Sequence, residues 1–284
     1  MKQQQINAVL CELSISCWTA KKLDKTASRE VKDSKGANSD DAATVRKNLM
    51  AGMDNLKRVT DYVASTRAEF YRMTLPWSDS GQRLIPMAQF FTLKEWINER
   101  ETEFNTLVTA FLQEYPTLIS AQAFQLGALF NRNEYPSVDE ISGKFAFRVA
   151  FLPLPAKGDF RVDAPKEIVD DMAQQYEQMY VERITQVQQD LWQRLHGVMT
   201  HMSERLGYDE NGKKLVFRDT LVENAVELCD ILKRLNVTND PDLEKARAYL
   251  ESVLLGVEAE DLRLSDGMRA GVKSQIDEAI TAWF

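Results

Sequence analysis

Apolar and polar residues alternate in two short segments of this chain. Residues 6–18 (INAVLCELSISCW) alternate over several steps, and between residues 145 and 152 every second position, starting at Phe145, is apolar. Period-two spacing is typical of a strand with one buried face. Because an unpaired strand leaves its backbone edge exposed, each of these two strands is the most plausible partner of the other.

A much longer apolar pattern, in the second half of the chain, has helical spacing. Residues 166–206 contain no proline and one glycine, which predicts a single helix about 60 Å long at ~1.5 Å per residue. Its apolar residues recur at intervals of four, four and three, and this eleven-residue repeat keeps the seam nearly straight. The pattern therefore favours a long antiparallel hairpin or bundle over a leucine-zipper dimer. The seam consists of Tyr176, Tyr180, Ile184, Val187, Leu191, Leu195, Val198, Met202 and Leu206.

The first half of the chain contains three further helical patterns. We expect a helix that begins at Asp40 or Asp41 and continues to residue 73, since aspartate caps helix N-termini. The next is expected over residues 88–115, where Pro116 ends it, and a third over residues 117–130.

Capping signals mark the remaining helices. Ser137 with Glu140 predicts a capping box before a short helix, and Thr220 with Glu223 predicts another. Asn239 or Asp240, followed by Pro241 as the first helical residue, opens a later helix. A last helix is expected from about residue 266 to the end of the chain.

Together these patterns predict a mainly α protein: a long antiparallel helical hairpin or bundle with a small β element, its strands near residues 6–18 and 145–152. Three consecutive parts follow from this. Residues 1–144 form an N-terminal α+β portion with a basic loop at 19–41. Residues 145–165 form a strand and proline-rich connector, and residues 166–284 form a C-terminal helical bundle.

Two proline-containing motifs combine fixed backbone with large apolar side chains. Residues 75–81 (LPWSDSG) contain turn residues around Trp77, and residues 151–155 (FLPLP) follow the second strand. Rigid apolar side chains bind partners at a low ordering cost, which predicts partner contacts for Trp77, Leu152, Pro153, Leu154 and Pro155. The same residues are also explained, and more simply, as corners where the chain crosses its own core.

The charge of the chain is unevenly distributed. The net charge is −8 and the pI about 5.1, which argues against a protein whose main task is to coat nucleic acid. Through residue 83, however, 14 Lys and Arg stand against 10 Asp and Glu, and beyond it 21 stand against 33. Any polyanion contact should therefore involve Lys21, Lys22, Lys25, Arg29, Lys32, Lys57 and Arg58. A solvated charged segment explains these residues too.

Cysteine usage and hydropathy predict a cytoplasmic protein. Cys11, Cys17 and Cys229 are an odd number at no metal-ligand spacing, and a chain of 284 residues needs no disulfide staples. The N-terminus lacks the continuous apolar core of a signal peptide, and no window approaches the ~20 apolar residues of a membrane span. We therefore expect no membrane association.

The sequence contains no recognisable catalytic motif. His196 and His201 are the only histidines, and their spacing places them about 140° apart around a helix, so they are poorly placed to share a metal. There is no glycine-rich phosphate loop. Carboxylate clusters such as Asp170 and Asp171 are explained as solvated helix faces. These observations predict a non-enzymatic protein without cofactor or metal.

Three short motifs carry a resemblance to a known family. TLPWSDSGQRLIP (74–86), LFNRNEYPS (129–137) and FLPLPAKGDFRVD (151–163) resemble an uncharacterised family of proteins from tailed bacteriophages and mobile elements. The resemblance covers about residues 6–206. It implies an infected or carrier bacterial cell and a gene neighbourhood with a MoxR-like or cobalt-chelatase-like AAA+ ATPase. It implies no activity and no catalytic residue.

Three hypotheses of function follow. The first is a non-enzymatic, oligomeric scaffold or adaptor that works through helix–helix contacts with itself or with a partner such as an AAA+ ATPase. The second is a nucleic-acid-binding accessory factor for replication, recombination or packaging, which would use the basic segment and show salt-dependent binding. The third is an inhibitor of a host defence enzyme, for which an acidic C-terminal surface could mimic DNA.

Overall fold

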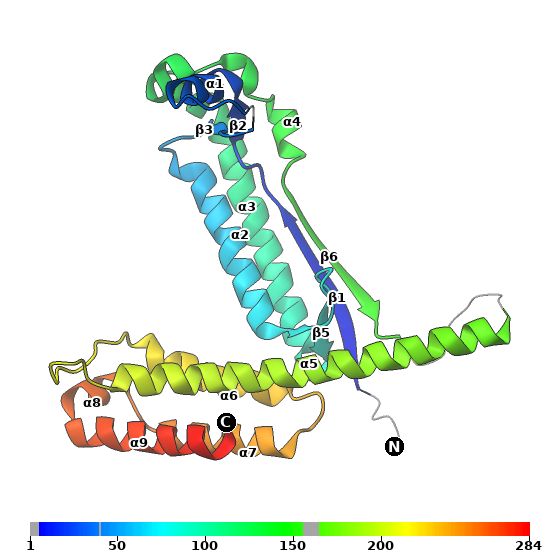
Figure 1. The fold of residues 1–284 in the computed structure, drawn as a ribbon, viewed down its shortest axis with the longest axis vertical. Coiled ribbons are helices and arrows are strands. Elements are labelled where there is room, and N and C mark those ends of the chain that lie inside the picture. Colours follow the sequence, from blue (N-terminus) through cyan, green and yellow to red (C-terminus); the bar gives the residue numbers. More distant parts are fainter. Residues whose placement is uncertain (1–5, 40, 156–164) are drawn as a thin grey trace. The chain divides into compact units, whose positions relative to one another are not determined.

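The computed structural model describes residues 6–39, 41–155 and 165–284. The chain is mainly α with a small antiparallel sheet, as predicted (Figure 1). It divides into two compact units, one formed by residues 1–12, 70–94 and 150–284 and the other by residues 13–69 and 95–149. This division differs from the three consecutive parts expected above, because four elements each run from one unit into the other. They are β1 (Ala8–Ser16), α2 (Asp54–Met73), α3 (Met87–Leu126) and β6 (Ala146–Pro153).

The first unit is built around an antiparallel helical bundle. Helix α5 (Lys166–Leu206) packs against α6 (Thr220–Leu235) and α9 (Asp266–Trp283), and α7 (Pro241–Leu254) closes the bundle by packing against α6 and α9. The short helix α8 (Ala259–Leu264) leads into α9. The bounds of α5 are those predicted, since nothing in its sequence interrupts a helix.

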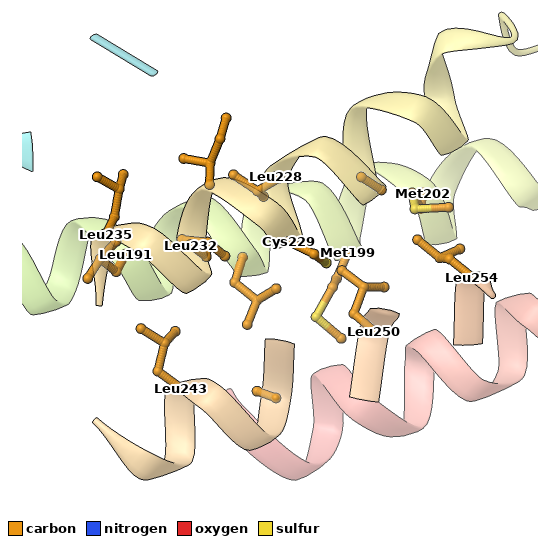
Figure 2. Packing of buried hydrophobic residues seen from close by; sticks show 14 of the residues in the cluster. Leu191, Met199, Met202, Leu228, Cys229, Leu232, Leu235, Leu243, Leu250 and Leu254 are labelled. Atoms are coloured by element: carbon orange, nitrogen blue, oxygen red, sulfur yellow. The ribbon is translucent and has the colours of Figure 1, made fainter. Parts of the chain in front are cut away.

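The core of this bundle is aliphatic. Figure 2 shows leucines and methionines of α5 pointing toward leucines of α6 and α7. Only the C-terminal part of the predicted seam is buried, and Met199 takes the place expected for Val198. The buried residues of α5 are Val187, Leu191, Leu195, Met199, Met202 and Leu206.

The sheet confirms the predicted strand pair and adds two short strands. Its order is β4 (Leu75–Pro76), β5 (Arg83–Pro86), β1 (Ala8–Ser16) and β6 (Ala146–Pro153). Strand β1 is thus the neighbour of β6, and it pairs antiparallel with β5 from Ala8 opposite Pro86 to Cys11 opposite Arg83. Pro76 lies in the edge strand β4 and Pro86 is the last residue of β5, both positions where a missing donor is tolerated. The remainder of the predicted connector, residues 156–164, lies outside the described residues.

The second unit packs helices α2 and α3 around an aromatic core. Trp18 of this core contacts Tyr115 edge to face at 5.7 Å between centroids, and the Tyr115 hydroxyl donates to the Pro136 carbonyl. The predicted capping box of Ser137 and Glu140 is present before the short helix α4 (Val138–Ser142). Two 3₁₀ turns, Gly127–Leu129 and Arg132–Glu134, precede it.

The prediction of a basic loop at residues 19–41 is wrong. Strand β2 (Lys21–Asp24) pairs antiparallel with β3 (Val45–Asn48), and helix α1 (Lys25–Ser34) lies between them in sequence. Asp24 caps this helix by accepting from the Ala27 N–H. The elements were missed because both strands are largely charged and show no apolar alternation.

Two predicted helix boundaries are also wrong. Helix α2 (Asp54–Met73) begins later than expected, since residues 45–48 form β3 and Gly52 has a φ of 71°, outside the helical region. Helix α3 (Met87–Leu126) continues through Pro116, which is exposed, so the two helices expected on either side of it are one.

Of the remaining predictions of helix starts, those for α7 and α9 are confirmed, and the capping box predicted for α6 is wrong. Asp240 caps α7 and Pro241 is its first residue, as expected, and α9 begins at Asp266. Helix α6 begins at Thr220, but its N-cap residue is Asp219 and no side chain caps it, so the predicted box of Thr220 and Glu223 is wrong. The Asp219 carboxylate pairs with Arg263 instead.

Candidate protein-interaction surface

The two proline-containing motifs meet on the middle of α5. The Trp77 ring contacts Tyr180 edge to face at 5.7 Å, and the Arg183 guanidinium lies 5.4 Å from the Trp77 ring centroid. The Tyr176 hydroxyl donates to the Pro155 carbonyl at 2.7 Å. Residues far apart in sequence are thus gathered on one stretch of this helix.

Most of the side chains predicted for a partner are used internally. Trp77 is only 3% exposed and belongs to the bundle core, so the prediction that it faces a partner is wrong. Leu152 and Leu154 are half-buried against the same core, whereas Pro153 and Pro155 are exposed. The structure therefore favours the corner interpretation for Trp77 and both leucines.

The N-terminal half of α5 presents an apolar stripe, of which only Tyr176 and Tyr180 belong to the predicted seam. Among the described residues, none between Lys166 and Gln186 is buried, although six later positions of the same helix are. Ile168 is 51% exposed and begins a stripe with helical spacing along one face. Val169, Met172, Tyr176, Met179 and Tyr180 continue it, all half-buried. We call residues 166–185 the α5 arm.

The back of the α5 arm is acidic and rich in glutamine. Glu167, Asp170 and Glu177 lie away from the stripe, as do Gln174 and Gln178. Gln178 donates to Glu182 one turn later, an interaction on the outer face. An apolar stripe backed by polar residues is the pattern of a helix that packs on one side.

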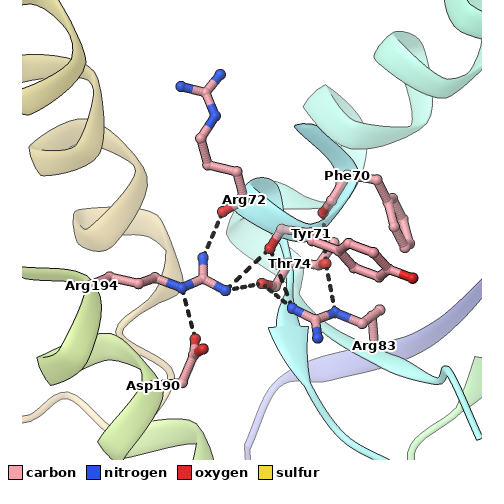
Figure 3. A network of polar contacts seen from close by, with 7 residues as sticks. All are labelled: Phe70, Tyr71, Arg72, Thr74, Arg83, Asp190 and Arg194. Atoms are coloured by element: carbon pink, nitrogen blue, oxygen red, sulfur yellow. Dashed lines mark hydrogen bonds and ion pairs between the residues drawn. The ribbon is translucent and has the colours of Figure 1, made fainter. Parts of the chain in front are cut away.

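A polar network fixes α5 just beyond the arm. Arg194 donates to the carbonyls of Arg72, Tyr71 and Thr74, where helix α2 ends, and its Nε lies 2.8 Å from the Asp190 carboxylate (Figure 3). Arg83 donates to two of the same carbonyls. Guanidinium groups satisfy the free carbonyls of a helix C-terminus and complement its dipole.

Burial lowers the pKa of both arginines. Burial, with the nearby Arg194 charge, lowers the pKa of Arg83 to about 10. Burial also lowers the pKa of Arg194, and the Asp190 carboxylate opposes this change. Both groups remain cationic at neutral pH, so the network persists there and anchors the base of the arm.

The basic residues predicted for polyanion binding lie mostly on one small region of the second unit. Lys25, Arg29 and Lys32 share one face of α1, because they are four and three residues apart. Lys21 and Lys22 are exposed on β2. Lys57 and Arg58 are exposed on α2, where Lys57 pairs with Asp61, so that its charge is partly compensated.

Histidines and cysteines form no metal site in the part of the chain that the structure describes. The His196 ring packs against Phe284 at 4.5 Å, and no three metal-ligating side chains come together among the described residues. Burial raises the pKa of Cys11 to about 12 and that of Cys229 to about 11, which keeps both thiols protonated at neutral pH. Within the same residues, no helix has the length and apolar character needed to span a bilayer.

Comparison with known proteins identifies no relative. No protein-family model, curated protein or solved structure matches the chain. The resemblance to phage and mobile-element proteins therefore stays a prediction.

Proposed function

We propose that this protein is a non-enzymatic scaffold or adaptor that assembles through the α5 arm. The observation that carries the proposal is the exposed part of the stripe, where Ile168 is 51% exposed and Met172 and Met179 are half-exposed, on a helix whose other half is deeply packed. Tyr176 and Tyr180, at the other end of the stripe, also contact Pro155 and Trp77. Half-exposed apolar residues at helical spacing gain free energy when a second helix covers them. The arm is anchored at its base by the Arg194 network, so it offers a preformed surface.

The stripe is self-complementary in an antiparallel pair of arms. With the pair centred on Gln174, Ile168 lies level with Tyr180 of a second copy, and Met172 lies level with Tyr176. Lys166 comes level with Glu182. A parallel, in-register pair would instead place each acidic residue level with the same residue of the second copy, and the repulsion between like charges is unfavourable. We therefore infer that the occupant is a second copy of this chain; an AAA+ ATPase, which the family resemblance suggests, is the alternative occupant.

Light scattering on a sizing column tests the proposal with matched variants. The variant Ile168→Glu/Met172→Glu places two charges in the stripe, and Gln174→Glu/Gln178→Glu places two on the opposite face. Because none of these positions is buried, both variants should fold. We expect a defined multimer for the wild type and the control, and a monomer for the stripe variant. A monomeric wild type, or a multimer unaffected by the stripe variant, would refute assembly through the arm.

A second candidate function, polyanion binding, is supported by the clustering on α1 and β2. Lys25, Arg29 and Lys32 form one basic face, but Glu30 and Asp33 interrupt the charge of the helix. If this surface contacts single-stranded DNA, the affinity falls with salt, by a log–log slope of about 0.7 per phosphate. Neutralising Lys21, Lys22 and Lys25 should then lower that slope by about 2. Unchanged binding in the triple variant would exclude these residues.

A further inference from the structure

A cavity of ≈510 Å³ lies between α5, α6 and the segment that joins them. Its volume is within the range of about 300–1,000 Å³ found for small-molecule sites. Helix α5 contributes one side and the first turns of α6 the other, with residues 216–218 forming a third wall. The cavity opens on the surface of the helical bundle of the first unit, where His201, Arg205 and Arg218 are exposed, and it is separate from the α5 arm.

The charged residues that line this cavity, Arg205 and Arg218, are both basic. Arg205 and His201 are one turn apart on the same face of α5, and Arg218 approaches from the joining segment. Their side chains have no hydrogen-bond or ion-pair partner among the described residues, and no lining residue is acidic. Thr220 and Asn224 add neutral donors. Such a lining is unusual in a portion of the chain where acidic residues outnumber basic ones.

The remaining lining is apolar. Phe217 and Leu221 are buried beneath the surface, and Val198 and Met202 complete this side. Cationic donors next to an aromatic and aliphatic wall fit a ligand with one anionic end and one apolar end.

Two arginines from other elements hold the third wall in place. Arg269, 1% exposed, donates at 2.8 Å to the carbonyls of Leu206 and Leu215, which lie before and after the turn at residues 210–211. Arg263 donates to the Phe217 carbonyl at 3.2 Å. Both guanidinium groups also lie against the Phe217 ring, 5.2 and 5.1 Å from its centroid. A wall fixed in this way loses little conformational entropy when a ligand binds.

We infer that this cavity binds a small organic phosphate monoester. Arg205, Arg218 and His201 would hold the phosphate, whose oxygens accept paired hydrogen bonds from guanidinium groups. The apolar group of the ligand would lie against Phe217 and Leu221. This inference is independent of the proposed assembly, since no residue of the cavity belongs to the arm.

Calorimetric titration at constant ionic strength tests the site with three probes: phenyl phosphate, inorganic phosphate and benzyl alcohol. We expect saturable binding of phenyl phosphate, at least about tenfold tighter than that of either other probe. The variant Arg205→Gln/Arg218→Gln should weaken phenyl phosphate binding by at least about tenfold. The control Lys233→Gln/Lys245→Gln removes the same charge at exposed positions elsewhere in the first unit and should leave binding unchanged.

Three results would overturn the inference. They are no saturable heat with phenyl phosphate up to about 10 mM, equal affinity for phenyl and inorganic phosphate, and equal weakening by the control variant. Both arginines of the test variant are exposed, so thermal melting that matches the wild type will show that the variant is folded.

Discussion

Single arginine side chains of the first unit satisfy the carbonyl groups at the C-termini of two helices. Arg194 and Arg83 bind the last carbonyls of α2, and Arg269 binds the last carbonyls of α5. Each long side chain reaches a helix C-terminus that would otherwise leave carbonyl groups unsatisfied. The ends of helices are therefore tied to other elements rather than left to local capping.

Removing Arg194 should destabilise the first unit. The variant Arg194→Met loses three hydrogen bonds to carbonyls and leaves Asp190 without its ion pair. We expect a loss of about 2–4 kcal/mol in the free energy of unfolding, measured by urea denaturation. Arg218→Met, at an exposed arginine, should cost no more than about 0.5 kcal/mol. Equal effects of the two substitutions would show that the network contributes nothing.

Asp24 should make stability depend on pH in the acid range. Its pKa lies below the ordinary 3.8 because its carboxylate accepts from the Ala27 N–H and pairs with Lys47. A lowered pKa stabilises the fold above the unfolded-state value, and this contribution is lost as pH falls through the folded-state value. Asp24→Asn keeps the cap but removes the charge.

The corresponding measurement is thermal melting of the wild type and Asp24→Asn between pH 7 and pH 3, a range that spans the ordinary pKa of 3.8. The wild type should melt at a higher temperature at pH 7, and the difference should shrink as the pH falls below about 4. A difference that stays constant over this range would mean that the charge of Asp24 does not stabilise the fold.

At the scale of elements, Pro116 lies within a continuous helix of 40 residues. Proline removes one backbone donor and presses on the preceding turn, so Pro116→Ala should stabilise α3 by about 1 kcal/mol or more. Ser120→Ala, one turn later and also exposed, should gain at most about 0.5 kcal/mol. Thermal melting compares the two. A loss of stability in Pro116→Ala would show that packing of the neighbouring Tyr115 requires the proline.

How well an element can be predicted from sequence depends on where its stabilising contacts come from. Helix α5 and the strand pair β1 and β6 were predictable because their own residues carry the period and no breaker interrupts them. The β2–β3 pair was not, since its strands are charged. Contacts from distant residues support it, including the Lys47–Glu134 ion pair and the hydrogen bond from Tyr135 to the Leu49 carbonyl.

The candidate interaction surface was also predicted only in part, because contacts from distant residues decide which side chains are covered. The spacing predicts the apolar seam from Tyr176 onward. It does not reveal which part of that seam other elements of the fold cover. Trp77 was predicted to face a partner, and its burial depends on Tyr180, about a hundred residues later. The cavity residues Arg205 and Arg218 have no local signature at all.

At the scale of the whole molecule, the chain builds two units from interleaved segments. Sequence alone suggested consecutive parts because a strand and a proline-rich connector at residues 145–165 separate the first helices from the long helix that follows. The contacts instead place residues 1–12 and 70–94 with the C-terminal bundle. Assembly through the α5 arm would therefore involve the first unit.

Hydrogen exchange of the wild-type chain, followed by mass spectrometry at low and high protein concentration, tests assembly through the arm most directly. If the chain assembles through the arm, amides of residues 166–185 exchange faster at low concentration and become protected at high concentration, whereas those of 187–206 stay protected at both. Exchange of residues 166–185 that does not change with concentration would contradict assembly through the arm.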